Sequence, residues 1–177
     1  IRRPPRSTRK ESSAASDVYK RQPDKCRWLK ETAGFDAVID YKNEDVNAQI
    51  AHHCPDKWDV FFDNVGGPIL EAALDHINLR SRVVLCGSIS GYNATTPIPG
   101  PSNLSNLTIN RARMEGFVIL DYMPRAMEAI QELMGWVSSG QLIYQVDLQE
   151  GFENIPTTLQ RLYAGQNLGK QLLKIDS

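Results

Sequence analysis

The stretch Trp58 to Gly67, WDVFFDNVGG, decides the fold of this 177-residue chain. Its nearly continuous apolar run predicts a strand over residues 58–65 that is buried on both faces, as in a parallel sheet. Gly66, Gly67 and Pro68 then predict a turn into a helix over residues 69–77, whose apolar residues recur every three or four positions. A second apolar run, Arg82 to Ile89 (RVVLCGSI), predicts the next buried strand.

The alternation of helix and strand continues on both sides of this unit. Further helices are predicted over residues 24–33, 44–53, 124–138 and 152–163, and further strands over 37–41, 114–120, 144–148 and 171–175. Residues 91–106 form a loop rich in Pro, Gly, Ser and Asn, and loops of this length are usually functional lids or disordered. The pattern predicts an α/β fold, a doubly wound parallel sheet.

Composition and charge narrow the functional classes. Hydrophobic residues make up 41% and charged residues 23% of the chain, which is typical of a soluble globular protein. No stretch reaches the ~20 apolar residues of a membrane span, and no secretory signal is indicated. The net charge is −1, but residues 1–22 are basic and the remainder is acidic, which argues against nucleic acid as the main partner.

The first 22 residues, IRRPPRSTRKESSAASDVYKRQ, have the composition of a disordered tail. A basic arm for nucleic acid or anionic lipid is one interpretation, and a processing segment is another. The string also resembles translated sequencing-adapter sequence. We therefore expect a non-native leader, with the native protein beginning upstream of what is seen.

No metal site or disulfide framework is expected. Cys26, Cys54 and Cys86 are scattered without a CxxC spacing, which fits a reducing cytosolic setting. His52 and His53 precede Cys54 directly, but adjacent helical residues point about 100° apart and cannot all face one ion.

Three places can carry chemistry, because ligands of open α/β sheets bind beyond the carboxyl ends of the strands. Asn64 follows the first buried strand, where the glycine pair either admits a ligand or only makes the turn. Tyr92 ends the segment CGSISGY, where its phenol can donate to an enolate oxygen or is simply exposed. Lys25 can meet a ribose 2′-phosphate or is a solvated helix lysine.

Residues 24–176 resemble the C-terminal part of the prostaglandin reductase, leukotriene B4 12-hydroxydehydrogenase and 2-alkenal reductase group of medium-chain dehydrogenases/reductases, a zinc-independent branch. The blocks that carry the resemblance come in the family's order: DKCRWL, GFDAVIDYK, WDVFFDNVGG, RVVLCGSISGYN, PIPGP, RMEGFVIL, GFENIP and GQNLGK. Together they are far more specific than any single block.

The resemblance implies a cytoplasmic NADP-dependent enzyme that reduces the carbon–carbon double bond of enones and enals with hydride from NADPH. Lys25 would contact the 2′-phosphate of NADP, and Tyr92 would lie beside the nicotinamide ribose and the substrate. The full set of implied cofactor contacts is Lys25, Tyr41, Asn64, Cys86, Gly87, Ser88, Ile89, Ser90, Tyr92, Phe117, Val118, Ile119 and Asn167. The family commonly forms homodimers through the edge strand near residues 114–120.

The chain departs from the family because the Gly-rich AxGxxG turn is absent, as are the first two strands and the N-terminal catalytic domain. A partial Rossmann-like domain is expected over residues 23–140, and residues 141–177 would return to the catalytic domain. The strand at 37–41 should then have no neighbour, and the one at 58–65 should have an unpaired edge. The strands at 144–148 and 171–175 should also lack partners.

The chain alone is therefore expected to bind NADPH weakly or not at all and to turn nothing over. Two alternatives stay open beside the enone reductase. One is a quinone reductase of the same superfamily, and the other is a non-catalytic nucleotide-binding or scaffold module on the same fold.

Overall fold

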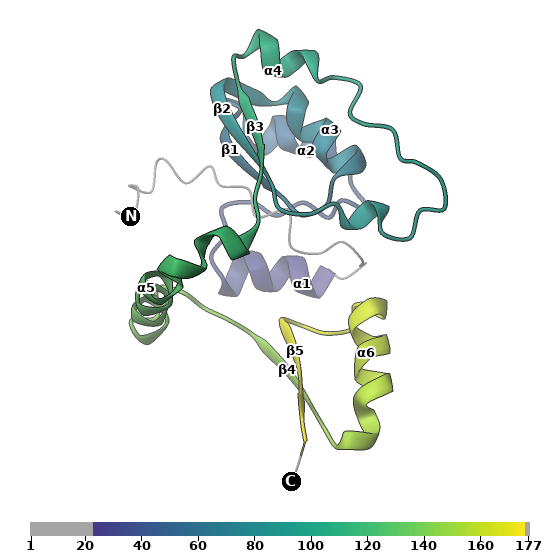
Figure 1. Ribbon diagram of the computed structural model, residues 1–177, viewed down its shortest axis with the longest axis vertical. Coiled ribbons are helices and arrows are strands. Elements are labelled where there is room, and N and C mark those ends of the chain that lie inside the picture. Colours follow the sequence, from purple (N-terminus) through teal and green to yellow (C-terminus); the bar gives the residue numbers. More distant parts are fainter. Residues whose placement is uncertain (1–22, 176–177) are drawn as a thin grey trace. The chain divides into compact units, whose positions relative to one another are not determined.

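The computed structural model describes residues 23–175, which form two compact units. Unit 1 comprises residues 35–121, and unit 2 comprises residues 23–34 together with 122–175 (Figure 1). The leader expected at residues 1–22 lies outside the described residues. The predicted domain boundary at residue 140 stays a prediction.

Unit 1 is built on a parallel sheet of β1 (Trp58–Asp63), β2 (Ile77–Leu85) and β3 (Arg113–Gly116), in the order β1-β2-β3. Connections through α3 (Gly67–Asp75) and α4 (Ser105–Ile109) make the parallel arrangement possible, since parallel strands need a crossover. The parallel α/β sheet predicted from the sequence is confirmed. Within the described residues β1 is an edge strand, also as expected.

The core of unit 1 lies on one face of the sheet, under α3 and α2 (Val46–His53). Trp58 is 2% exposed, and its indole nitrogen donates to the carbonyl of Ala73 over 3.1 Å, so its polar atom is satisfied. The largest contributors to the core are Ile50, Trp58, Phe61, Leu70, Leu74, Ile77 and Val83.

The prediction that β1 is buried on both faces is wrong for this unit. Phe61 and Asp63 are buried, whereas Val60 is 42% and Phe62 is 39% exposed. Side chains alternate between the two faces of a strand, and α2 and α3 pack on the face of Phe61. The apolar run therefore reflects a strand with apolar side chains on both faces. Residues of unit 1 cover only one of these faces.

Two segments that were predicted as strands differ in the structure. Residues 37–41 form no strand, because a strand requires a partner and none of the described residues supplies one. The strand predicted over 114–120 is β3, which ends at Gly116, and a 3-10 helix runs over Ile119–Arg125. Phe117 still donates its amide to Leu85 over 2.8 Å, but β2 ends there and offers no further ladder.

Unit 2 begins with a helical stretch formed by α1 (Pro23–Arg27) and a π-helical turn, Trp28–Thr32. The long helix α5 covers Ala126–Ser138. The unit ends in a β-α-β arrangement of β4 (Val146–Glu150), α6 (Ile155–Ala164) and β5 (Lys170–Lys174), with a 3-10 turn at Phe152–Asn154.

The expectation that the last two strands lack partners is wrong. β4 and β5 pair with each other in parallel, with Val146 opposite Lys170 and Glu150 opposite Lys174. Helix α6 is long enough to serve as the crossover, and Gly165 ends it in the left-handed conformation. The main-chain groups of β4 and β5 thus hydrogen-bond to each other, whereas the family resemblance implied partners in the catalytic domain.

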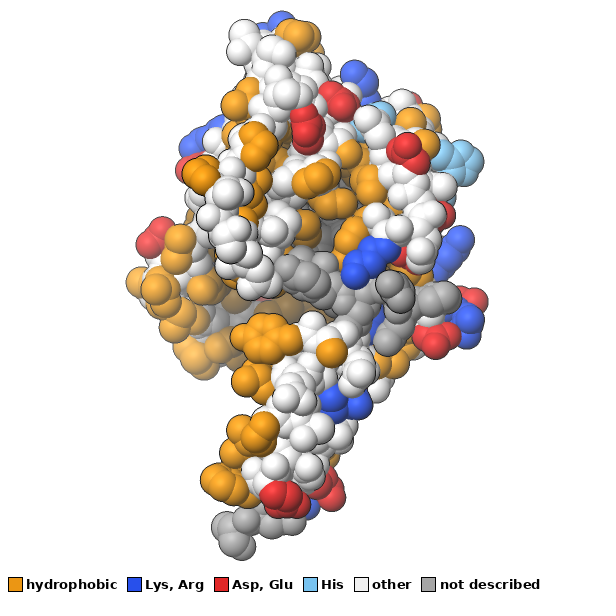
Figure 2. All heavy atoms as spheres, turned by 90° about the vertical axis from the view of Figure 1, so that its right-hand side faces the viewer, with side chains coloured by type: hydrophobic (Ala, Val, Ile, Leu, Met, Phe, Trp, Pro, Cys, Tyr) orange, Lys and Arg blue, Asp and Glu red, His pale blue; other side chains and the backbone are white. Residues whose placement is uncertain are grey.

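Many apolar side chains remain exposed, as the orange atoms on the face in Figure 2 show. On α5 no residue is buried, and Met127 and Met134 are 64% and 63% exposed. Exposed apolar area of this extent marks surfaces that other protein normally covers. None of the helices in residues 23–175 combines the length and apolar character needed to cross a membrane.

His76 lies just after α3 and contacts the side-chain oxygen of Asn47 on α2. Burial lowers the pKa of His76 below its ordinary value of 6.5, and the Lys57 ammonium lowers it further, against the opposing charge of Asp75. The folded chain therefore takes up a proton at this site less readily than the unfolded chain does.

We expect the free energy of unfolding to be independent of His76 above about pH 6.5 and to fall as the pH drops below it, because the unfolded chain protonates first. The loss should stop once the pH passes below the folded-state pKa. Denaturant titrations at a series of pH values would measure this. The H76Q variant should lose part of the pH dependence, and an unchanged slope in H76Q would refute the assignment to His76.

Candidate functional site

Asp63, the last residue of β1, organises the carboxyl ends of β1 and β2. Its carboxylate is fully buried and accepts the main-chain amides of Val65 at 2.8 Å and Gly66 at 3.0 Å. Its main-chain carbonyl accepts the amides of Cys86 at 2.8 Å and Gly87 at 3.1 Å. One residue therefore shapes the turn after its own strand and binds the segment that follows the neighbouring strand.

The two segments continue side by side beyond Asp63. The amide of Ile89 donates to the carbonyl of Asn64 over 3.2 Å, and the amide of Ser90 donates to the carbonyl of Val65 over 3.1 Å. The hydroxyl of Ser90 adds a second bond to the Val65 carbonyl at 2.6 Å. Residues 63–67 and 86–90 thus form one hydrogen-bonded edge at the end of the sheet.

The glycines of this edge serve contacts inside the protein. A methyl group at Gly66 would meet the Ser88 hydroxyl oxygen at 2.6 Å, and one at Gly67 would meet the Ser90 hydroxyl oxygen at 3.1 Å. A methyl group at Gly87 would meet the carbonyl oxygen of Asn64 at 3.3 Å. The neighbouring serines make the close approach that the glycine pair permits, and the admission of a ligand at this turn stays a prediction.

Several polar side chains remain accessible at this edge. Cys86 is a free, exposed thiol, Ser88 and Ser90 are exposed, and Asn64 is half-buried. Tyr92 is 71% exposed and follows a 3-10 turn over Ile89–Gly91. Hydroxyl, amide and phenol groups at the carboxyl ends of parallel strands can hydrogen-bond a polar ligand.

The long loop after Tyr92 is tied down at its far end. The Asn103 amide donates to the Glu71 carbonyl at 2.8 Å and to the Asp75 carboxylate at 2.7 Å. The Asn106 amide donates to the same Asp75 oxygen at 3.1 Å. The far end of the segment predicted as a lid or disordered loop is thus anchored on α3.

Other predicted contact residues lie elsewhere. Tyr41 is half-buried in a turn of unit 1. Phe117 stacks edge-on against Phe62 with ring centroids 5.8 Å apart, whereas Val118 and Ile119 are 54% and 61% exposed beyond the end of β3. Phe117–Ile119 therefore do not form the strand that the sequence predicted for them.

Two predicted cofactor contacts belong to unit 2. Lys25 on α1 is only 7% exposed, so it is not a solvated surface lysine. Asn167 lies in the turn between α6 and β5, where its amide donates to the Gly169 carbonyl over 2.7 Å.

The role of Asp63 was not predicted from the sequence. A signal was present, because an Asp that precedes a Gly by three residues is typical of turns in which the carboxylate accepts main-chain amides. Asp63 lies within the apolar run that predicts a strand over residues 58–65, so it was assigned to the strand and not to the turn. The sequence pointed to Asn64 instead, because it follows the predicted strand and because the family resemblance implies a cofactor contact there.

No metal centre is found in the part of the chain that the structure describes, since no group of three or more His, Cys, Asp or Glu side chains converges there. The rings of His52 and His53 meet edge-on with centroids 4.8 Å apart, and both side chains are exposed. Cys54 is half-buried.

The sequence matches the zinc-binding dehydrogenase family over residues 18–139. It is 36% identical over 157 residues to the NADPH-dependent curcumin reductase of Escherichia coli, covering 86% of this chain and 46% of that protein. It is 37% identical over 148 residues to the NADP(+)-dependent 2-alkenal reductase of Nicotiana tabacum, covering 83% of this chain and 43% of that protein. The resemblance to alkenal reductases is thereby confirmed.

Among solved structures, CurA from Vibrio vulnificus in complex with NADPH superposes with a TM-score of 0.79 at 37% identity. The superposition covers 88% of this chain and 48% of that one. The chain thus spans a little under half the length of the relatives it matches.

The geometry of the edge makes Gly66 a sensitive position. Its φ of 70° and ψ of −162° lie in a region that is essentially restricted to glycine, where another residue costs about 1–3 kcal/mol. We expect G66A to lower the free energy of unfolding by about that amount, through backbone strain and the clash with Ser88. The control G100A, where an added methyl group meets nothing within 4 Å, should be near neutral. Equal stability of the two variants in denaturant titrations would contradict the packing described for this edge.

Proposed function

Because this chain belongs to the zinc-binding dehydrogenase family, we propose that it is the C-terminal part of an NADP-dependent reductase acting on enones and enals. The observation that carries the proposal is the hydrogen-bonded edge of residues 63–67 and 86–90, with Asn64 and Cys86 accessible on it. Ligands of open α/β sheets bind at this position, beyond the carboxyl ends of the strands. Relatives named as alkenal, curcumin and prostaglandin reductases support the reaction class.

NADP is the proposed cofactor, and when bound it supplies the hydride. Asn64, Ser88 and Ser90 would hold the nicotinamide side, on a frame that Asp63 joins through its hydrogen bonds. Lys25 would meet the 2′-phosphate, which distinguishes NADP from NAD, and Asn167 would add a polar contact. The other proposed cofactor contacts are Tyr41, Cys86, Gly87, Ile89, Tyr92, Phe117, Val118 and Ile119.

Tyr92 is the proposed catalytic residue. Reduction of an enone places negative charge on the carbonyl oxygen as the hydride arrives at the far carbon of the double bond. The Tyr92 phenol would donate a hydrogen bond to that oxygen, and its exposure leaves it accessible to a substrate. The family description names zinc, but the described residues offer no cluster to hold it, so no step is assigned to a metal.

The proposed assembly is a cytosolic homodimer. β3 is an edge strand of its sheet, and Val118, Ile119 and Leu120 beyond it are all exposed. An unpaired strand edge next to exposed apolar side chains is a surface suited to pairing with a second copy. The three cysteines are scattered without a CxxC spacing, which fits a reducing compartment.

Two alternatives are tested by the same assays. A quinone reductase would oxidise NADPH with a quinone and not with an enone. A nucleotide-binding module without catalysis would bind NADPH and would have no need of the Tyr92 phenol.

We expect the 177-residue chain alone to show no NADPH-dependent enone reduction, because it has no AxGxxG turn to hold the pyrophosphate. Resequencing the gene upstream of the Pro23 codon tests for a longer reading frame. If one is found, the extended protein that it encodes should consume NADPH with an enone. In that protein Y92F should lower kcat by about a hundredfold with little change in NADPH affinity. Robust turnover by the 177 residues alone would overturn the first expectation, and an extended protein that binds NADPH without turnover would favour the binding module.

The proposed role of Lys25 predicts a change in cofactor preference. K25M in the extended protein should raise the dissociation constant for NADPH about tenfold, because a charge-assisted contact to the 2′-phosphate is lost. Affinity for NADH, which lacks that phosphate, should change little. The control K30M removes a charge from the exposed Lys30 of the same helical stretch and should affect neither. Parallel losses for both cofactors in K25M would point to a structural role instead, and unfolding curves would show it.

A further inference from the structure

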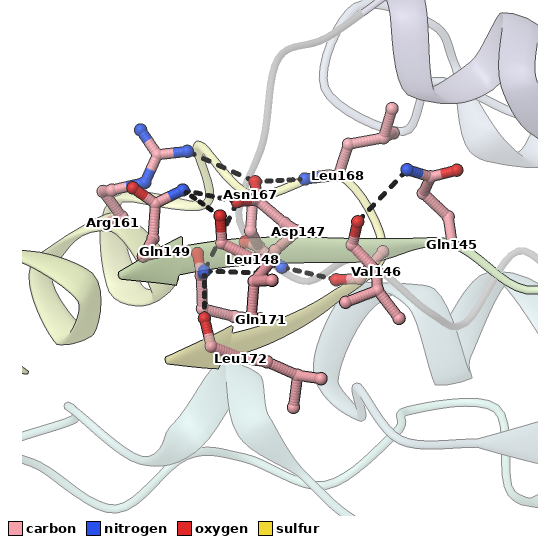
Figure 3. Close-up of polar contacts among 11 residues, drawn as sticks. Gln145, Val146, Asp147, Leu148, Gln149, Arg161, Asn167, Leu168, Gln171 and Leu172 are labelled. Carbon is pink, nitrogen blue, oxygen red and sulfur yellow. Dashed lines mark hydrogen bonds and ion pairs between the residues drawn. The ribbon is translucent and has the colours of Figure 1, made fainter. Parts of the chain in front are cut away.

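The interior of the β-α-β part of unit 2 holds a carboxylate, that of Asp147 on β4. Figure 3 shows it between the helix, the neighbouring strand and the turn that leads into β5. One oxygen accepts the Arg161 guanidinium at 3.2 Å and the main-chain amide of Leu168 at 3.1 Å. The other accepts the side-chain amides of Gln149 at 2.8 Å and Gln171 at 3.4 Å. Both oxygens of Asp147 therefore face donors only.

Asp147 is held in its ionised form at neutral pH. Its side chain is 14% exposed, and burial alone raises its pKa. The bonds from Gln149 and Leu168, the charge of Arg161 and the bond from Gln171 together lower the pKa of Asp147 below its ordinary value of 3.8. The network is thus arranged around the negative charge.

The turn that Asp147 holds carries Asn167. Leu168, whose amide Asp147 accepts, directly follows Asn167, and the Asn167 side chain reaches across to the Gly169 carbonyl at 2.7 Å. At the next residue, the Lys170 amide donates to the Gln145 carbonyl at 2.8 Å, which begins the pairing of β4 with β5. Gly165 and Gly169 both have positive φ and give the main chain freedom on either side. The bond from Leu168 to Asp147 restricts that freedom in the middle of the turn.

We propose that Asp147 is a positioning residue, which fixes the turn at residues 166–169 so that Asn167 is presented to the cofactor. This rests on the role of Asn167 given in the proposed function. A partly buried ion pair adds little net stability, since desolvation offsets the attraction, so its effect here is on the geometry of the turn. Asp147 and Arg161 join strand, helix and turn, and the turn moves if either contact is lost.

The decisive variant is D147N in the extended protein. Asparagine keeps the shape but removes the charge. If its oxygen faces Leu168 and Arg161, their acceptor is neutral, and if its nitrogen faces them, they have no acceptor, so the bond to a charged acceptor is lost in either orientation. The matched control is E150Q on the same strand, where the carboxylate is exposed and lies 4.0 Å from Lys174. N167A tests the cofactor contact itself.

The readouts are amide hydrogen exchange at Leu168 and Gly151, and KM for NADPH separated from kcat. We expect Leu168 to exchange about tenfold faster in D147N, because a bond to a charged acceptor is lost, with Gly151 at the other end of the sheet unchanged. KM for NADPH should rise in both D147N and N167A, the double variant should add little, and kcat should change less than KM. E150Q should match the parent protein in every measurement.

The other outcomes separate the two claims. Unchanged exchange at Leu168 in D147N would overturn the positioning role. The same conclusion would follow if Leu168 exchanged faster in D147N but KM for NADPH rose only in N167A. An unchanged KM in N167A would remove the proposed cofactor contact and the positioning role with it. Equal acceleration at Leu168 and Gly151 would show that Asp147 acts on the whole unit, and this too would overturn the proposal.

Discussion

The structure of unit 1 depends on how the ends of two parallel strands are joined, and Asp63 makes that junction. Main-chain amides beyond the last rung of a parallel ladder need acceptors if they are buried. Asp63 supplies its carboxylate to Val65 and Gly66 and its carbonyl to Cys86 and Gly87. The shape of the turn, the entry into α3 and the exposure of the candidate ligand-binding groups follow from these bonds.

Unit 2 repeats the principle with a different carboxylate. Asp147 stands at the beginning of β4 and accepts the amide of Leu168 in the turn before β5, while Arg161 balances its charge. In both units a carboxylate joins main-chain segments that are distant in the sequence, and in both it lies directly beside a residue or turn expected to contact the cofactor. Rigid support of this kind allows a site to hold its geometry without a ligand.

Much of the fold could be predicted because hydrophobic periodicity is a local property. The runs around Phe61 and Val83 predicted strands, and the spacing of Leu70, Ala73 and Leu74 predicted the helix between them. The predictions failed where pairing decides the outcome. Residues 37–41 have the composition of a strand, but none of the described residues pairs with them. By contrast, β4 and β5 were expected to be unpaired and pair with each other.

The sequence by itself determined the α/β class, the family and the identity of the accessible polar residues, because motifs and periodicity lie in short stretches of chain. It could not show that Ser88 and Ser90 fill the space left by Gly66 and Gly67, or that Asp147 would meet Leu168, 21 residues away. Only the tertiary structure decided these contacts. Hydrogen-bond acceptors are assigned by distance in space, and distance in space is set by how helices return one strand beside another.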